Sequence, residues 1–141
     1  MTGMAEIITL DDNPDRLRQF QENLVGTVQR QVTTAADAIR ALEADEPPMV
    51  VFLDHDLGDV ETCGDGMQVA KWAAAQDVRF KGTFFIVHSL NPAAARRMVD
   101  TLSDVGVSAV LQPFAWDDIP WLEGILELIR TRRLDESRVS G

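Results

Sequence analysis

The most informative stretch of this chain is VVFLDHDLGDVETCGDG, from Val50 to Gly66. A continuous apolar run ends abruptly in Asp54, His55 and Asp56. This pattern predicts a strand that is buried on both faces and delivers polar groups to the rim of a parallel sheet, where ligands of open α/β sheets bind. Burying two carboxylates and an imidazole without partners would cost a free energy on the order of what a small domain has to spare. We therefore expect a functional site at this rim.

Strand-like and helix-like segments alternate along the rest of the chain. Asn13-Pro14 and Asn91-Pro92 each predict a helix start, because asparagine caps a helix and proline fits its first turn. Strands are predicted over residues 6–10, 27–32, 49–53, 82–88 and 107–111, and helices over 14–26, 34–45, 66–76, from 92 onward and over 117–132. The alternation predicts an α/β fold with a doubly wound, five-stranded parallel sheet in the strand order 2-1-3-4-5. Residues 5–132 form one predicted domain, and residues 133–141 form a predicted flexible C-terminal tail.

Composition excludes several classes of function. The formal net charge is −10, and such an acidic surface repels a phosphate backbone, so we do not expect duplex nucleic acid as a partner. No apolar stretch approaches the roughly 20 residues of a membrane span, and no secretory signal is recognisable. The single cysteine, Cys63, rules out an intramolecular disulfide and favours a cytoplasmic protein.

Polar residues follow three of the predicted strands. Asp11 and Asp12 follow the first, residues 54–56 follow the third, and residues 88–91 follow the fourth. In the predicted strand order these three ends lie at one edge of the sheet. Carboxylates crowded in this way raise each other's pKa unless a cation joins them, and hard oxygen ligands favour Mg²⁺ or Mn²⁺ over zinc.

Both histidines of the chain, His55 and His88, fall at these strand ends. Near neutral pH an imidazole can act as a general acid or base. One possibility is that His88 faces the site. Because neighbouring residues on a strand point to opposite faces, the other is that His88 turns into the core while Ser89 faces the site. Ser89 and Asn91 can hydrogen-bond phosphate oxygens at a helix N-terminus.

The chain resembles the receiver domain of two-component response regulators over nearly its whole length. The resemblance rests on LDD at residues 10–12, LD at Leu53-Asp54, Ser89 after the fourth strand, and Pro113-Phe114. It implies the flavodoxin-like receiver fold and an Mg²⁺ site.

The resemblance also implies roles for individual residues. Asp11, Asp12 and Asp54 would hold the metal, and Asp54 would accept a phosphoryl group that Ser89 contacts. Asp56 stands where the family coordinates the metal through a backbone carbonyl.

Two positions depart from the receiver pattern. The lysine that neutralises the phosphoryl group corresponds to Gln112, and the switch aromatic corresponds to Ala109. A neutral amide can contact phosphate oxygens but cannot supply positive charge. The chain therefore lacks two residues on which ordinary phosphosignalling by receivers depends. Gln112 remains a candidate for phosphate binding.

A more specific resemblance is to a receiver subgroup named the cyclic-phosphate processing receiver domain. It rests on LDHDLG at residues 53–58, Gly66, VHSLNP at residues 87–92 and Arg97-Met98, and it covers roughly residues 7–111. The subgroup is associated with RNA repair, so a small phosphate ligand or an RNA terminus becomes an implied partner.

Three hypotheses for the function follow. The first is an enzyme in which Asp11, Asp12 and Asp54 hold a metal at a cyclic or terminal phosphate and His55 or His88 handles the proton. The second is a phosphoacceptor receiver module that uses Asp54 in a phosphorelay with a protein partner. The third is a non-catalytic domain that acts through protein contacts. Receivers often pair through their fourth and fifth helices, so a homodimer is also expected.

Overall fold

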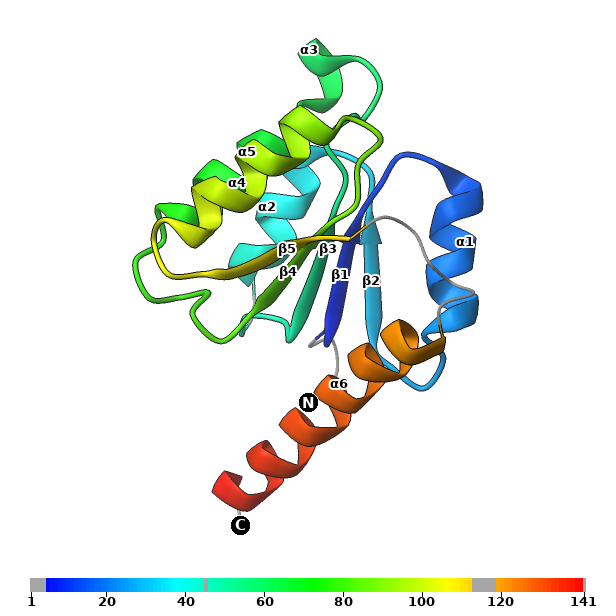
Figure 1. Cartoon of the computed structure of the whole chain (residues 1–141), viewed down its shortest axis with the longest axis vertical. Helices are drawn as coiled ribbons and strands as arrows, with labels where there is room; N and C mark the ends of the chain where they lie inside the picture. The colour runs from blue at the N-terminus through cyan, green and yellow to red at the C-terminus, as the bar shows by residue number, and fades with distance from the viewer. Residues whose placement is uncertain (1–4, 45, 113–118, 141) are drawn as a thin grey trace.

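The computed structural model describes residues 5–44, 46–112 and 119–140. Five short strands form one parallel sheet in the order β2-β1-β3-β4-β5, which confirms the predicted strand order (Figure 1). The strands are β1 (Ile7–Leu10), β2 (Gln29–Val32), β3 (Val50–Leu53), β4 (Phe84–Val87) and β5 (Ser108–Leu111). The polar strand β2 lies at an edge of the sheet, as its sequence predicts.

Helices cover both faces of this sheet. They are α1 (Pro14–Asn23), α2 (Ala35–Ala44), α3 (Val60–Cys63), α4 (Gly66–Ala74), α5 (Pro92–Ser103) and α6 (Ile119–Ser140). Figure 1 shows α2, α4 and α5 together on one side of the sheet and α1 on the other. Buried residues of α6 join those of α1 in the second core cluster.

Two elements differ from the sequence prediction. The short helix α3 lies inside the segment predicted as a loop, where Asp59 caps it by accepting a hydrogen bond from the backbone N–H of Glu61. Helix α6 continues past its predicted end at Arg132, because no glycine or proline interrupts the chain there. Arg133, in this extension, pairs with Glu6. The flexibility of residues 133–141 stays a prediction, and Pro113-Phe114 lies outside the described residues.

The alternation of side chains along the strands decides which residues face which helices. Ile7, Val50, Phe52 and Ile86 belong to the core cluster beneath α1 and α6, whereas Ile8, Val51, Phe85 and Val87 belong to the cluster beneath α2, α4 and α5. Continuing the alternation beyond the strand ends directs Asp11, Asp54 and His88 to the α1 and α6 side. The alternation along the strands thus places the side chains of these three residues on the same face of the sheet.

None of the helices in the described part of the chain combines the length and the apolar character needed to cross a lipid bilayer.

Candidate functional site

Three buried polar residues form one row at the carboxyl end of the sheet. Leu10, Leu53 and Val87 are aligned across β1, β3 and β4, so the next residue of each strand continues the alignment. The backbone N–H of Asp54 donates to the carbonyl of Leu10 at 3.0 Å, and that of His88 donates to the carbonyl of Leu53 at 2.9 Å. Asp11, Asp54 and His88 are 0%, 4% and 2% exposed, and each offers a ligand atom within 4.8 Å of the other two.

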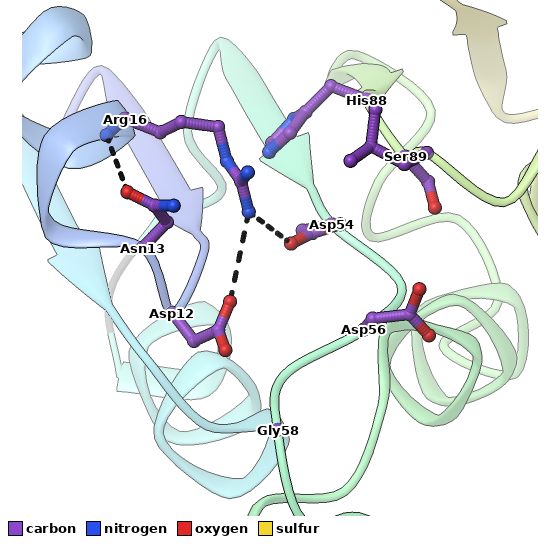
Figure 2. A pocket seen from close by; sticks show the side chains of 9 residues that line it. Asp12, Asn13, Arg16, Asp54, Asp56, Gly58, His88 and Ser89 are labelled. Carbon is purple, nitrogen blue, oxygen red and sulfur yellow. Dashed lines mark hydrogen bonds and ion pairs between the residues drawn. The ribbon is translucent and has the colours of Figure 1, made fainter.

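Arg16 of α1 reaches into this row (Figure 2). Its Nη2 lies 3.0 Å from Asp11 Oδ1, 3.2 Å from Asp54 Oδ2 and 3.8 Å from Asp12 Oδ1. Helix α1 begins at Pro14 because the Asn13 side chain accepts hydrogen bonds from the backbone N–H groups of Asp15 and Arg16. This early start places Arg16 one helical turn after Asp12 and over the strand end. A single nitrogen therefore contacts three carboxylates. We call Asp11, Arg16, Asp54 and His88 the inner cluster.

Asp11 is the most heavily hydrogen-bonded member of the inner cluster. Its Oδ1 accepts from the backbone N–H of Asn13 at 2.9 Å and from Arg16 Nη2, and its Oδ2 accepts from Arg16 Nε at 2.8 Å and bonds His88 Nε2 at 3.0 Å. Burial alone raises the pKa of Asp11, but the hydrogen bonds with His88 and Arg16 outweigh it and lower this pKa to about 2. Asp11 is therefore ionised at neutral pH.

Asp54 lies in the opposite electrostatic situation. Burial raises its pKa, the neighbouring charge of Asp11 raises it further, and Arg16 only partly opposes them, so the pKa of Asp54 is about 7. The inner cluster thus carries more negative charge than one guanidinium neutralises. Carboxylate oxygens that follow two strands already surround one cationic nitrogen. Such a set of oxygen ligands fits Mg²⁺ or Mn²⁺.

His88 satisfies both alternatives that its sequence position allows. Its ring is buried against Phe20 and Phe52, with centroid distances of 5.3 and 6.2 Å, yet its Nε2 reaches Asp11. Burial lowers the pKa of His88, and the hydrogen bond with Asp11 only partly offsets this effect. Because ionised Asp11 can only accept, Nε2 carries the proton and donates it to that carboxylate. His88 is therefore a neutral donor that orients Asp11.

His55 lies in a different environment, because it follows Asp54 beyond the end of β3 and has the opposite orientation. Its Nδ1 bonds Asp56 Oδ1 at 2.8 Å, and its Nε2 lies 3.8 Å from Asp65 Oδ2. Asp65 also caps α4 through the backbone N–H of Gln68. We call His55, Asp56 and Asp65 the outer cluster. The side chain of Asp56 is 65% exposed, so this cluster is in contact with water.

A pocket of about 300 Å³ opens over Arg16, Asp54 and His88 of the inner cluster, a volume at the lower end of the range for small-molecule sites. Asp11 is fully buried and is absent from the described lining. The described residues that line it are Asp12, Asn13, Arg16, Asp54, Asp56, Gly58, His88, Ser89 and Leu90. Of the three candidates for phosphate binding, Ser89 is among these residues. Asn91 instead caps α5 by accepting from the backbone N–H of Ala94, and the backbone N–H of Gln112 extends the sheet by donating to Val87. His55 is likewise absent from the described lining.

Gly66 allows the outer loop to lie directly against the inner cluster. A Cβ atom at this position would lie 2.2 Å from the carbonyl oxygen of Asp54 and 2.7 Å from Met98 Cε. The backbone N–H of Gly66 donates to the carbonyl of His55 at 3.0 Å. A side chain here would therefore push the two clusters apart.

Sequence reasoning missed Arg16, Asn13 and Asp65 as members of the site. The available signal for Arg16 was its spacing from Asp12, since positions i and i+4 of a helix start lie on one face. Asp65 precedes Gly66 at a helix start, a position where aspartate is a common cap.

Comparisons with known proteins agree with this architecture. A family model described as the cyclic-phosphate processing receiver domain matches residues 7–104. Adenylate cyclase from Rhodopirellula baltica shares the fold at 14% identity and a TM-score of 0.63, over 97% of this chain and 98% of that chain. The BeF3-activated DrrB receiver domain matches at 20% identity and a TM-score of 0.61, over 91% and 99% of the two chains. The signal receiver domain of an HD domain-containing protein from Pseudomonas fluorescens Pf-5 matches at 16% identity and a TM-score of 0.63, over 92% and 99%. A search of curated protein sequences finds no match.

Proposed function

Because the chain belongs to the cyclic-phosphate processing receiver domain family, we propose that its pocket binds a cyclic or terminal phosphate together with Mg²⁺ or Mn²⁺ and opens the cyclic ester. One observation carries this proposal: three carboxylates surround a single cationic nitrogen of Arg16, and Arg16 lines a pocket of about 300 Å³ together with two of them, Asp12 and Asp54. The site therefore combines carboxylates that can bind a metal ion with a guanidinium that can bind a phosphate.

The metal in this proposal is held by carboxylates from two strands. Asp11, Asp12 and Asp54 would bind it, with the backbone carbonyl of Asp56 as a further ligand expected from the receiver pattern. When bound, the ion supplies Lewis acidity that withdraws charge from the phosphate oxygens. His88 acts as a positioning residue, because its hydrogen bond holds the Asp11 carboxylate in one orientation.

The reaction proposed is hydrolysis of a nucleoside 2′,3′-cyclic phosphate, such as the end of a cleaved RNA. The oxygen of a water molecule forms a bond to phosphorus, and the bond from phosphorus to the 2′ or 3′ oxygen breaks. One proton of that water ends on the departing oxygen, so the product is a monophosphate ester. Asp56 lines the pocket and shares a hydrogen bond with His55. In this proposal the pair carries the proton.

The test is incubation of the protein with nucleoside 2′,3′-cyclic phosphates and Mg²⁺ or Mn²⁺, with product followed by phosphorus NMR. Asp54→Asn and Asp56→Asn should each lose about a hundredfold or more in rate, the usual effect of removing a metal ligand or a proton carrier. Asp15→Asn is the matched control, because Asp15 lies on α1 with its side chain 83% exposed. Absence of any monophosphate product with either metal contradicts this function.

A second candidate function is phosphoacceptance by Asp54 in a phosphorelay. It is favoured by the position of Asp54 Oδ2 in the pocket wall, 3.2 Å from a guanidinium nitrogen that could neutralise a phosphoryl group. A kinase and a downstream protein would then be the partners, and pairing of two copies through α5 and α6, the fourth and fifth of the predicted helices, would be one way to transmit the signal. Incubation with acetyl phosphate should give a phosphoryl adduct by intact-mass measurement that Asp54→Asn abolishes. If neither the adduct nor turnover is found, the domain acts through protein contacts alone.

In either case we place the protein in the cytoplasm, since one cysteine among 141 residues is typical of a reducing compartment.

A further inference from the structure

Arg16 occupies the position between the carboxylates that a bound cation would need. Its guanidinium makes two hydrogen bonds to Asp11, with Nε at 2.8 Å and Nη2 at 3.0 Å, and a further contact to Asp54 at 3.2 Å. We propose that Arg16 leaves these carboxylates when the site takes up a divalent cation, and that its guanidinium then binds the phosphate of the substrate. This inference rests on the metal and phosphate binding in the proposed function, and it does not depend on turnover.

The hydrogen bonds of Asp11 identify Arg16 as the group that moves. Each oxygen of Asp11 already accepts two hydrogen bonds, so a cation can reach this carboxylate only if a donor withdraws. The Asn13 donor is backbone at the start of α1, and the His88 ring is 2% exposed and held against Phe20 and Phe52. The side chain of Arg16 is 24% exposed and ends a long flexible stem. Arg16 is therefore the donor with room to withdraw.

The charge of the pocket gives Arg16 its second role. With its carboxylates ionised, the site with Arg16 alone is net negative and repels a phosphate. Among the described residues that line the pocket, Arg16 is the one that carries positive charge, and Gln112 stands at the lysine position of receivers. A guanidinium also matches the geometry of phosphate oxygens through two parallel hydrogen bonds. Gln112, which follows β5, carries no charge, and Arg16 of α1 provides positive charge in its place.

Cooperative binding of the cation and the phosphate follows from this exchange. While Arg16 pairs with Asp11 and Asp54, it is not available to a phosphate, and the carboxylates are not available to a cation. Withdrawal of Arg16 makes both available at once, so the cation and the phosphate should each strengthen the binding of the other by the same factor.

The test measures binding by calorimetry in the full chain, with Mn²⁺ first and then with a nucleoside 2′,3′-cyclic phosphate at saturating Mn²⁺. Arg16→Ala should bind Mn²⁺ about tenfold more tightly than wild type, because the competing cation is gone, and should bind the cyclic phosphate about tenfold more weakly. Arg18→Ala is the matched control: Arg18 lies on the same helix and pairs with exposed Asp15, so both affinities should stay within about twofold of wild type.

A second measurement covers the case in which Arg16→Ala does not fold. The Arg16 Nε–H signal in a nitrogen-15 NMR spectrum is assigned by its loss in Arg16→Lys. Mg²⁺ alone should shift this signal to the position of a guanidinium without its Asp11 bond, and added cyclic phosphate should shift it again. An Nε–H signal that Mg²⁺ leaves unchanged overturns the inference.

The outcomes separate the two proposals. Equal Mn²⁺ affinity in wild type and Arg16→Ala, or undiminished binding of the cyclic phosphate to Arg16→Ala, overturns the role of Arg16 and leaves the metal site standing. No Mn²⁺ uptake by either protein overturns the proposed function and this inference together. Tighter Mn²⁺ binding without turnover supports the exchange and counts against the hydrolytic step alone.

Discussion

The inner and outer clusters contain similar residues but have opposite physical character. Each places a histidine within 3.0 Å of an aspartate at the end of the sheet. In the inner cluster the side chains of Asp11 and His88 are 0% and 2% exposed, whereas in the outer cluster those of Asp56 and His55 are 65% and 17% exposed. The same pair of residue types is therefore a buried structural contact in one place and a water-facing pair in the other.

The difference arises because the position of a residue after its strand decides the face of the sheet on which its side chain lies. His88 directly follows β4 and Asp11 directly follows β1, so both turn toward α1 and the core. His55 lies one residue further along and turns toward α4. Leaving a buried carboxylate without one of its hydrogen-bond donors costs about 1 to 3 kcal/mol or more, while an exposed pair contributes about 0 to 1 kcal/mol. Substitutions in the two clusters should therefore differ sharply in effect.

The largest expected difference is between the two histidines. His88→Ala removes a ring packed on Phe20 and Phe52 and the donor to Asp11, so we expect the free energy of unfolding to fall by about 3 kcal/mol. His55→Ala should change it by less than about 1 kcal/mol. Urea unfolding at neutral pH measures both, and equal losses would contradict the contrast between the clusters.

A smaller effect is expected where the two clusters meet. Gly66→Ala would place a Cβ 2.2 Å from the backbone carbonyl of Asp54, and we expect a loss of about 2 kcal/mol because backbone must shift. Gly124→Ala in α6 is the control: its Cβ would meet no atom within 4 Å, and alanine should stabilise the helix by about 0.5 to 1 kcal/mol. Thermal unfolding of the two variants should shift in opposite directions, and a neutral Gly66→Ala would show that the loop is not tightly held.

The last expected effect depends on pH and concerns the two aspartates of LDHD. The pKa of Asp54 is raised from 3.8 to about 7, so the stability associated with its protonation is fully present below about pH 4 and is lost as pH rises through 7. Asp54→Asn avoids this loss, so it should be more stable than wild type at about pH 8, with little difference at about pH 4. Asp56→Asn should stay within about 0.5 kcal/mol at either pH. Unfolding curves at both pH values decide this, and a gap that does not grow with pH would argue against the crowding of Asp54.

Much of the fold was predictable from local patterns. The apolar runs that end in aspartate or histidine predict β1, β3 and β4, and Asn13-Pro14 and Asn91-Pro92 predict the starts of α1 and α5. The exact end of α6 was not predictable from polarity alone, because a polar sequence without glycine or proline can continue a helix. Helix α3 was missed because it spans only Val60–Cys63 and buries no residue.

The candidate site was predictable in its residues but only partly in its contacts. The convergence of Asp11, Asp12 and Asp54 follows from the strand order, and the sequence alone indicates it. The hydrogen bond between His88 and Asp11 and the insertion of Arg16 require the packing of α1 on β1, β3 and β4. No pattern along the chain contains these distances, since Asp11 and His88 are separated by 77 residues.

The alternation of strands and helices, the acidic rim and the glutamine in place of a lysine at position 112 can all be read from the chain, because periodicity and residue type are local properties. Packing between elements determines which histidine becomes a buried partner of Asp11, and it places an arginine of α1 as the positive charge among the described residues of the pocket. The physical reason is that burial and charge pairing depend on which side chains several elements bring together. A difference of one residue beyond a strand end changes the face on which a side chain lies, and with it the solvent, the neighbours and the pKa.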